Sequence, residues 1–249
     1  MDEYFAEFLG TSILILLGNG AVANVCLRKT KGENSGWIVI TAGWGMAVFI
    51  AVFTVGPISG AHINPAVTLG LAVSGLFGWD KVIPFLIAQV LGGMTGGFLV
   101  YSFYKDHFNT TDNPDAKLAC FCTIPNIRNL KVNFLSEVIG TFILVFAVLF
   151  VNLPHIEIEG LGNAKVGLGS LEALPVGLVV FAIGLSLGGT TGYAINPARD
   201  FGPRLIHYLL PIKGKRDSDW HYSWIPIAGP VCGAFISTLF YFFINWISA

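Results

Sequence analysis

The chain has 249 residues, of which 54% are hydrophobic and only 12% charged, whereas about a quarter of the residues in a typical soluble domain are charged. A water-soluble domain of this length could not bury so much apolar surface, and the composition also excludes intrinsic disorder, a coiled coil and collagen. The formal net charge of −1 gives no basic footprint for nucleic acid. The sequence therefore predicts a protein that crosses a membrane several times.

Six apolar runs follow one another along the chain, each with about the 20 residues that a helix needs to cross about 30 Å of hydrocarbon. A transmembrane β-barrel would instead show alternating stretches of about ten residues. Because backbone inside a bilayer must satisfy its own hydrogen bonds, we predict six transmembrane helices. The runs are Tyr4–Leu27, Gly36–Val55, Val82–Tyr104, Val132–Pro154, Leu171–Gly189 and Tyr222 to the last residue.

Two shorter apolar stretches, Pro57–Phe77 and Thr190–Leu210, are interrupted by proline and glycine and carry nearly the same sequence. The tetrapeptide Ile-Asn-Pro-Ala occurs at 63–66 and again at 195–198, an offset of 132. The first and fourth runs share Glu-x-x-Gly-Thr-x-Ile-Leu at an offset of 130. The chain is therefore a duplication.

This duplication divides one domain, residues 1–249, into a first repeat over 1–105, an inter-repeat loop over 106–131 and a second repeat over 132–249. Each repeat holds three spans, an odd number, so the second repeat must enter the membrane from the opposite side. The result is an inverted repeat whose two short segments meet near the middle of the membrane.

The motifs Asn64-Pro65-Ala66 and Asn196-Pro197-Ala198 each predict the start of a helix, since Asn is a preferred N-cap and Pro is favoured at the first helical position. Helices of about 11–13 residues would follow and reach only half way across the membrane. Their positive N-termini would face each other. The Asn side-chain oxygen would cap the helix and leave its NH₂ group as a donor.

The backbone before each of these asparagines cannot be helical, and such backbone is tolerated at membrane depth beside a water-filled cavity. We therefore expect exposed carbonyl groups to line a path for neutral hydrogen-bonding molecules, with cations repelled at its midpoint. The expected carbonyls are those of Gly60, Ala61, His62, Ile63, Gly192, Ala194 and Ile195.

With this pair of motifs the sequence resembles the aquaporin superfamily of water and small-solute channels over essentially its whole length. The segment Asn196 to Arg204, NPARDFGPR, resembles the glycerol facilitator branch, in which Asp follows the Arg. The resemblance implies an all-α membrane fold with six transmembrane helices and two re-entrant half-helices around a central pore. It also implies a homotetramer in which each subunit has its own pore, with both termini cytoplasmic.

The resemblance further implies a selectivity filter at four positions, which counting from the two asparagines places at Trp44, Gly184, Tyr193 and Arg199. Arg199 would cost about 2.5–3.5 kcal/mol at the bilayer centre on insertion scales, so it must face water or partners. The two rings offer apolar faces and Gly184 leaves room, which suits a polyol. A strict water pore would be expected to carry His in place of Gly184.

The filter departs from the branch at one position, because glycerol facilitators often have Phe where this chain has Tyr193. The added hydroxyl leaves open a preference for water or other polar solutes.

Among the remaining polar residues, Glu7 and Glu137 occupy equivalent positions of the two repeats. We expect each to brace the loop before a half-helix, with a proton relay as the alternative. His62 is expected to be a structural or pore-lining donor, and Asp200 to support the N-terminus of its helix. No cysteine, histidine or carboxylate spacing predicts a metal, and no nucleotide loop or nucleophile motif is present, so we expect no cofactor and no enzymatic activity.

The sequence thus predicts a multi-pass protein of the cell membrane, a passive channel for glycerol and related small neutral solutes, with water, that excludes protons and ions. Its expected partners are these solutes, the lipid bilayer and other copies of the chain, but no nucleic acid. One alternative is a predominantly water-selective pore, and another is an ion- or proton-coupled transporter that uses Glu7 and Glu137.

Loop charge disagrees with the cytoplasmic termini that the resemblance implies. The side that holds both termini has only Lys81 and Lys165 in its loops, and the positive-inside rule would place that side outside. We follow the resemblance, because re-entrant helices constrain the fold more than loop charge does. The loops of the opposite side hold ten basic residues: Arg28, Lys29, Lys31, Lys105, Lys117, Arg128, Lys131, Lys213, Lys215 and Arg216.

Overall fold

The computed structural model describes residues 1–151, 155–158, 162–165 and 168–248. Within this part of the chain, six helical segments are long and apolar enough to cross a membrane, and the prediction of six spans is confirmed. They are α1 (Glu3–Cys26), α2 (Trp37–Ser59), α4 (Trp79–Phe103), α7 (Leu130–Phe150), α8 (Leu174–Leu187) with the preceding 3₁₀ turn η1 (Gly169–Ala173), and α10 (Ile225–Ile247).

The predicted boundaries differ from those of the structure by one to several residues, most clearly at the end of the second span. Helix α2 does not stop at Val55 but continues through Pro57 to Ser59, which is possible because neighbouring groups in a membrane protein satisfy the backbone that a proline frees. Residues 152–154, with which the predicted fourth span ends, lie outside the described residues, as does residue 249.

The two half-length helices, α3 (Pro65–Val73) and α9 (Pro197–Leu209), start at the predicted residues. The Asn64 side chain accepts a hydrogen bond from the backbone N–H of Ala66, and the Asn196 side chain accepts from those of Ala198 and Arg199. Helix α9 has 13 residues, but α3 has only 9. It ends early because Gly75 turns into the left-handed region with φ of +76°.

Some short elements were not predicted. Helices α5 (Lys105–Thr110) and α6 (Pro114–Ala119) lie in the inter-repeat loop, and strands β1 (His155–Ile158) and β2 (Gly162–Lys165) pair antiparallel between α7 and α8. Strands of four residues and helices of six leave no readable hydrophobic period, so a search for periodicity could not reveal them. The Asn113 side chain caps α6, and Pro114 is its first residue.

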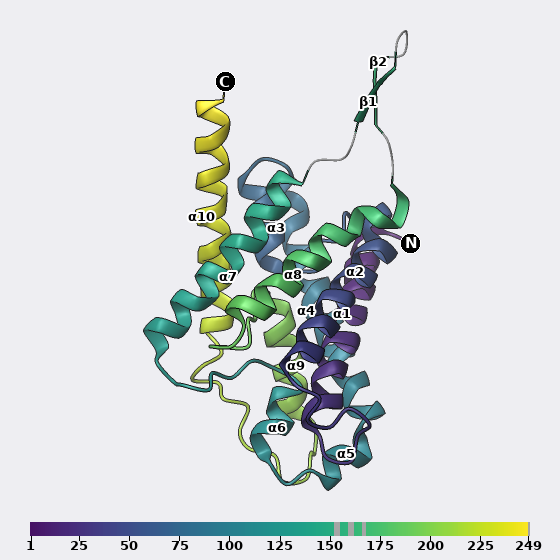
Figure 1. Cartoon of the computed structure of the whole chain (residues 1–249), viewed down its shortest axis with the longest axis vertical. Coiled ribbons are helices and arrows are strands. Elements are labelled where there is room, and N and C mark those ends of the chain that lie inside the picture. The colour runs from purple at the N-terminus through teal and green to yellow at the C-terminus, as the bar shows by residue number, and fades with distance from the viewer. Residues whose placement is uncertain (152–154, 159–161, 166–167, 249) are drawn as a thin grey trace.

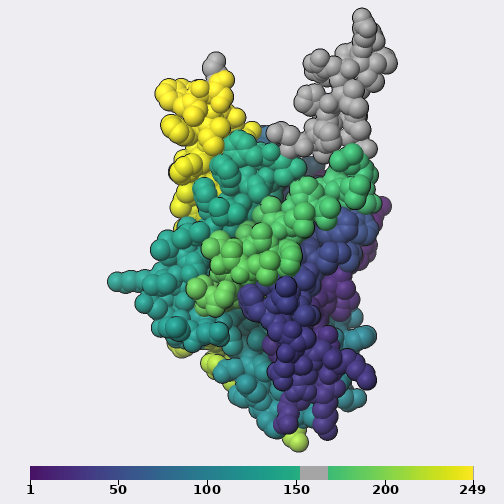
Figure 2. Space-filling view, viewed as in Figure 1, coloured from purple at the N-terminus to yellow at the C-terminus, as the bar shows by residue number. Residues whose placement is uncertain are grey.

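The repeats are interlocked rather than side by side. Helix α9 of the second repeat packs on α4 of the first, and α3 of the first repeat packs on α10 of the second. Both termini lie away from the end of the molecule that carries α5 and α6 (Figure 1). On the face shown in Figure 2, α8 lies between α7 and α2, and its contact with α2 also joins the two repeats.

Glycines allow the closest helix contacts. A Cβ atom at Gly96 on α4 would lie 2.6 Å from the Ile15 Cβ and 2.7 Å from the Ser12 carbonyl oxygen on α1. A Cβ at Gly233 on α10 would lie 2.4 Å from the Val138 carbonyl oxygen on α7. Small residues let helix backbones approach in this way, and apolar packing of this kind associates helices inside a bilayer.

We therefore expect Gly96→Ala to lower the free energy of unfolding by about 1–3 kcal/mol, because the added methyl must push α1 and α4 apart. Thermal unfolding in detergent measures the loss. Gly20→Ala is the matched control, since a Cβ at Gly20 on α1 meets nothing within 4 Å. Equal melting temperatures for the two variants would contradict the close-packing explanation.

Candidate functional site

The loop before α3 is held to α1 by one buried carboxylate. Oε1 of Glu7 accepts hydrogen bonds from the Ser59 hydroxyl (2.7 Å) and the His62 N–H (2.9 Å). Oε2 accepts from the Ile63 N–H (2.6 Å) and the Gln89 side-chain amide (2.7 Å). Both oxygens of a fully buried side chain are therefore occupied by donors.

The second repeat reproduces this arrangement at the loop before α9. Glu137 on α7 accepts hydrogen bonds from the Thr191 hydroxyl (2.7 Å), the Ala194 N–H (3.0 Å) and the Ile195 N–H (2.9 Å). Within the part of the chain that the structure describes, neither glutamate is hydrogen-bonded to a second titratable side chain. This geometry suits a brace and offers no next step for a proton relay.

The direction of these N–H groups fixes the direction of the carbonyls. In a trans peptide the carbonyl of the preceding residue points opposite to the N–H. Because the N–H groups at 62, 63, 194 and 195 point at the glutamates, four carbonyls point away from them, into the space between the loops: those of Ala61, His62, Tyr193 and Ala194. The carbonyl of Tyr193 was not among the expected ones.

The same loops hold bulky residues in an unusual backbone conformation. Ile63 has φ of +43° and Ile195 has φ of +44°, although β-branched residues rarely enter this region. Such strain persists only where the surroundings fix the backbone, and the N–H groups of both residues are bound by the glutamates.

The two asparagines join the repeats at the centre. The Asn64 side-chain amide donates to the Ile195 carbonyl (2.8 Å), and the Asn196 amide donates to the Ile63 carbonyl (2.8 Å). The NH₂ group of each asparagine, expected to remain as a donor after the cap is formed, uses one of its two protons in this bond. The two isoleucine carbonyls, expected to line the passage, are partners of the asparagines.

Two cavities adjoin at three shared residues. We call the cavity beside both asparagines the central cavity, of about 130 Å³, and the cavity bordered by α6 and Thr123 the vestibule, of about 340 Å³. The central cavity is also bordered by Gly60, Ala61, His62, Ile63, Ala194 and Ile195, whereas Gly192 borders the vestibule. The residues that border both cavities are Trp44, Tyr193 and Arg199.

Gly184, the fourth expected filter residue, borders neither cavity. A Cβ at this position would lie 2.8 Å from the Cζ and Oη atoms of Tyr193 and 2.9 Å from the Thr41 Cγ2. Its carbonyl accepts a hydrogen bond from the Trp37 indole (2.9 Å). Gly184 therefore stands behind the Tyr193 ring and makes room for that ring, not directly for a solute.

Arg199 is only 6% exposed, and its guanidinium lies over the Trp44 ring at 4.1 Å from the ring centroid. Nη1 is 3.5 Å from the side-chain oxygen of Asn19, a residue that the sequence analysis missed. Among the described residues no carboxylate pairs with Arg199. Its other donors are therefore available to molecules in the passage.

Asp200 does more than support the start of α9. It accepts hydrogen bonds from the Thr123 N–H (2.8 Å) and hydroxyl (2.7 Å), and it forms a fully buried ion pair with Arg204 (2.7 Å). Arg204 in turn donates to the carbonyls of Thr123 and Ser218. The pair thus fixes two loops at the vestibule, and its spacing of four residues on one helix is the signal that could have revealed it.

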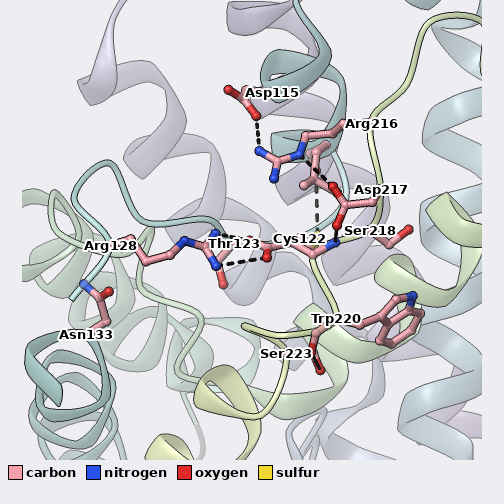
Figure 3. A network of polar contacts seen from close by, with 12 residues as sticks. Asp115, Cys122, Thr123, Arg128, Asn133, Arg216, Asp217, Ser218, Trp220 and Ser223 are labelled. Atoms are coloured by element: carbon pink, nitrogen blue, oxygen red, sulfur yellow. Dashed lines mark hydrogen bonds and ion pairs between the residues drawn. The ribbon is translucent and has the colours of Figure 1, made fainter. Parts of the chain in front are cut away.

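Charged side chains connect the same loops at the surface (Figure 3). Arg128 pairs with Asp219, and Arg216 pairs with Asp115 at the rim of the vestibule. The hydrogen bond with Asp219 raises the pKa of Arg128. Burial raises the pKa of the Cys122 thiol in the vestibule wall to about 12, so this cysteine stays protonated at neutral pH.

The site offers no metal chemistry in the described residues, which contain no group of three or more His, Cys, Asp or Glu side chains able to hold an ion. His62 is instead bonded through Nδ1 to the Thr68 hydroxyl (3.1 Å) and packs edge-on against the Phe77 ring.

The offset of 132 maps the four expected filter residues onto small apolar residues. All of them border the central cavity, at the side away from the vestibule: Val176, Val52, Ala61 and Val67. At these four pairs of positions, aromatic and charged side chains therefore occur only on the vestibule side.

Comparisons with known proteins agree with this architecture. The sequence profile of the family described as "Major intrinsic protein" matches residues 1–241. The chain is 57% identical over 247 residues to a probable glycerol uptake facilitator protein of Thermotoga maritima, covering 99% of this chain and 100% of that protein. It is 51% identical over 239 residues to the glycerol uptake facilitator protein of Streptococcus pneumoniae, covering 96% and 97%. The X-ray structure of the aquaglyceroporin from Plasmodium falciparum superposes with a TM-score of 0.81 at 34% identity, covering 96% and 94% of the two chains.

The braces make different demands on an amide replacement. Each carboxylate oxygen of Glu7 accepts two hydrogen bonds, so in Glu7→Gln the new NH₂ group leaves two donors without an acceptor. Oε2 of Glu137 accepts only one, so in Glu137→Gln the NH₂ group can take the place of that oxygen and leave one donor without an acceptor. We expect Glu7→Gln to lower the melting temperature more than Glu137→Gln. Leu at either position should cost most, since each buried donor left unpaired costs about 1–3 kcal/mol. Unchanged melting of both Leu variants would contradict the bracing role.

Proposed function

The chain belongs to the major intrinsic protein family, and we propose that it is a passive channel that conducts glycerol and related small neutral solutes together with water. It is a multi-pass membrane protein of a channel family. The observation that carries the proposal is that, among the described residues, Trp44, Tyr193 and Arg199 are the ones that border both cavities. We infer that a solute passing from one cavity to the other passes between them, at the narrow point of the passage.

The chemistry of this narrow point fits a polyol. The rings of Trp44 and Tyr193 offer apolar surface to the C–H edge of the molecule, and the free N–H groups of Arg199 can donate to its hydroxyls. Beyond the narrow point, the backbone carbonyls accept hydrogen bonds from the hydroxyls. Neutral molecules thus recover the hydrogen bonds that they lose on leaving water.

Ions do not recover their hydration in the same way. A cation meets the fixed charge of Arg199 and then the N-termini of α3 and α9, which carry the positive ends of two helix dipoles. We infer that the channel excludes cations and protons at these two levels.

A predominantly water-selective pore is the second candidate, and one observation favours it. Gly184 borders neither cavity, so the room that was expected for a polyol is occupied by the Tyr193 ring. A coupled transporter has less support, because the hydrogen bonds of Glu7 and Glu137 already hold the loops.

We further propose a homotetramer with both termini in the cytoplasm. The basic residues of the loops opposite the termini favour the other orientation. We give more weight to the two half-length helices α3 and α9, because re-entrant helices constrain the fold more than loop charge does. Protease or tag accessibility on intact cells tests the orientation.

A passive channel should let glycerol move only down its gradient. In reconstituted vesicles, stopped-flow light scattering should show glycerol flux that is unaffected by an imposed ΔpH or membrane potential, because the site holds fixed donors and no titrating carrier. Protein-free vesicles are the control. Accumulation of glycerol against its gradient under a proton gradient would overturn the proposal in favour of a coupled transporter.

The position of Gly184 behind Tyr193 gives a test of selectivity. Gly184→His should push the Tyr193 ring into the passage and lower glycerol permeability about tenfold, with a much smaller effect on water, since fit in a pocket discriminates by this order. Gly20→Ala is the control, because a Cβ there meets nothing within 4 Å and Gly20 borders neither cavity. An unchanged ratio of glycerol to water permeability in a folded Gly184→His variant would show that Tyr193 does not form the narrow point.

A further inference from the structure

Asn19 on α1 is a fully buried polar residue that bridges two parts of the site. Its amide nitrogen donates to the Phe121 carbonyl (3.0 Å), and its oxygen faces Nη1 of Arg199 at 3.5 Å, the long end of the hydrogen-bonding range. The Phe121 carbonyl can only accept, so it turns the NH₂ group of Asn19 toward itself. The Asn19 oxygen is thereby directed at the guanidinium.

The Arg199 guanidinium has few other partners. It lies against the Trp44 ring, and the neighbouring residue of α1 makes this possible, because a Cβ at Gly18 would lie 2.3 Å from that ring. Among the described side chains, Asn19 supplies the acceptor within hydrogen-bond distance of the Arg199 guanidinium. Arg204, only five residues away, is instead held by a carboxylate.

The internal duplication provides a natural comparison. The offset of 130 that relates Glu7 to Glu137 relates Asn19 to Leu149, and the offset of 132 relates Arg199 to Val67. The polar pair Asn19–Arg199 therefore corresponds to the apolar pair Leu149–Val67 at the symmetry-related place in the fold. A buried amide in a membrane helix is costly, and of the two equivalent positions 19 and 149 only the one that faces the arginine carries an amide. This difference indicates that the amide of Asn19 acts on the arginine.

We propose that Asn19 is a positioning residue that holds the Arg199 guanidinium against the wall of the passage and so sets its selectivity for glycerol. This inference rests on the proposed channel function. Without the Asn19 oxygen, Nη1 would face an apolar wall and would turn toward the passage to find an acceptor in water or solute. The passage would narrow, and glycerol would be hindered more than water.

The test compares Asn19→Val with the wild-type protein in reconstituted vesicles, with glycerol and water permeabilities measured by stopped-flow light scattering. We expect the ratio of glycerol to water permeability to fall about fivefold, the size of a typical coupling between contacting residues. The matched control is Asn24→Val on the same helix. The Asn24 side chain also binds loop backbone, at Gly32, but has no hydrogen bond with Arg199.

A second experiment, made in the Arg199→Val variant, separates a positioning role of Asn19 from a merely structural one. If Asn19 acts through the arginine, Asn19→Val should leave the permeability ratio unchanged when it is introduced into Arg199→Val. In the double variant both positions are apolar, as they are in the symmetry-related pair Leu149–Val67. The same fold-change in both backgrounds would overturn the proposal, since Asn19 would then act through the Phe121 loop.

Asn19→Leu gives the same decision if Asn19→Val does not fold, because Leu is close to Asn in size and stands at the equivalent position 149 of the other repeat. It also removes the oxygen that faces Arg199, so the ratio should again fall, and an unchanged ratio would overturn the inference. Wild-type glycerol flux no faster than in protein-free vesicles would instead refute the channel function itself. Wild-type flux with an unaffected Asn19→Val ratio refutes only the role of Asn19.

Discussion

The hydrogen bonds from loop N–H groups to two buried carboxylates are the interaction on which the site depends. Without an acceptor for the N–H groups of Ile63 and Ile195, neither residue would stay in its left-handed conformation. The carbonyls on the same peptides would then not point into the passage. A charge buried in a membrane protein thus acts here through geometry. It fixes the direction of backbone dipoles, and those dipoles meet the solute.

The same loops also connect the two repeats. Each central asparagine caps its own half-helix and donates to the loop carbonyl of the other repeat, so the two half-helices are held end to end by reciprocal hydrogen bonds. A half-helix alone would leave its N-terminal donors unsatisfied in the membrane. The interlocked packing of α9 on α4 and of α3 on α10 follows the same logic. Neither repeat could bury its short helix without the other.

Much of this architecture could be predicted because it leaves periodic or repeated signals in the sequence. Span length, the Asn-Pro pairs and the offsets of 130 and 132 predicted the six spans and the starts of both half-helices. Contacts between distant side chains leave no such signal. The bond from Asn19 to Phe121 joins residues 102 positions apart, and the place of Gly184 depends on which way the Tyr193 ring turns. The short hairpin and α5 are too brief to show a period.

The proposed filter lies where the two repeats differ in sequence. The glutamate braces and the asparagine caps occur in both repeats and build a symmetric frame. The residues of the proposed narrow point are not repeated in this way, since Trp44 and Arg199 correspond to Val176 and Val67 at the other side of the central cavity. A symmetric frame gives two equivalent positions for a filter, and one narrow point is enough to select a solute. A second set of filter residues would bury another charge in the membrane and add another barrier to the solute. The apolar residues at the side of the central cavity away from the vestibule avoid both costs, so the solute can leave on that side.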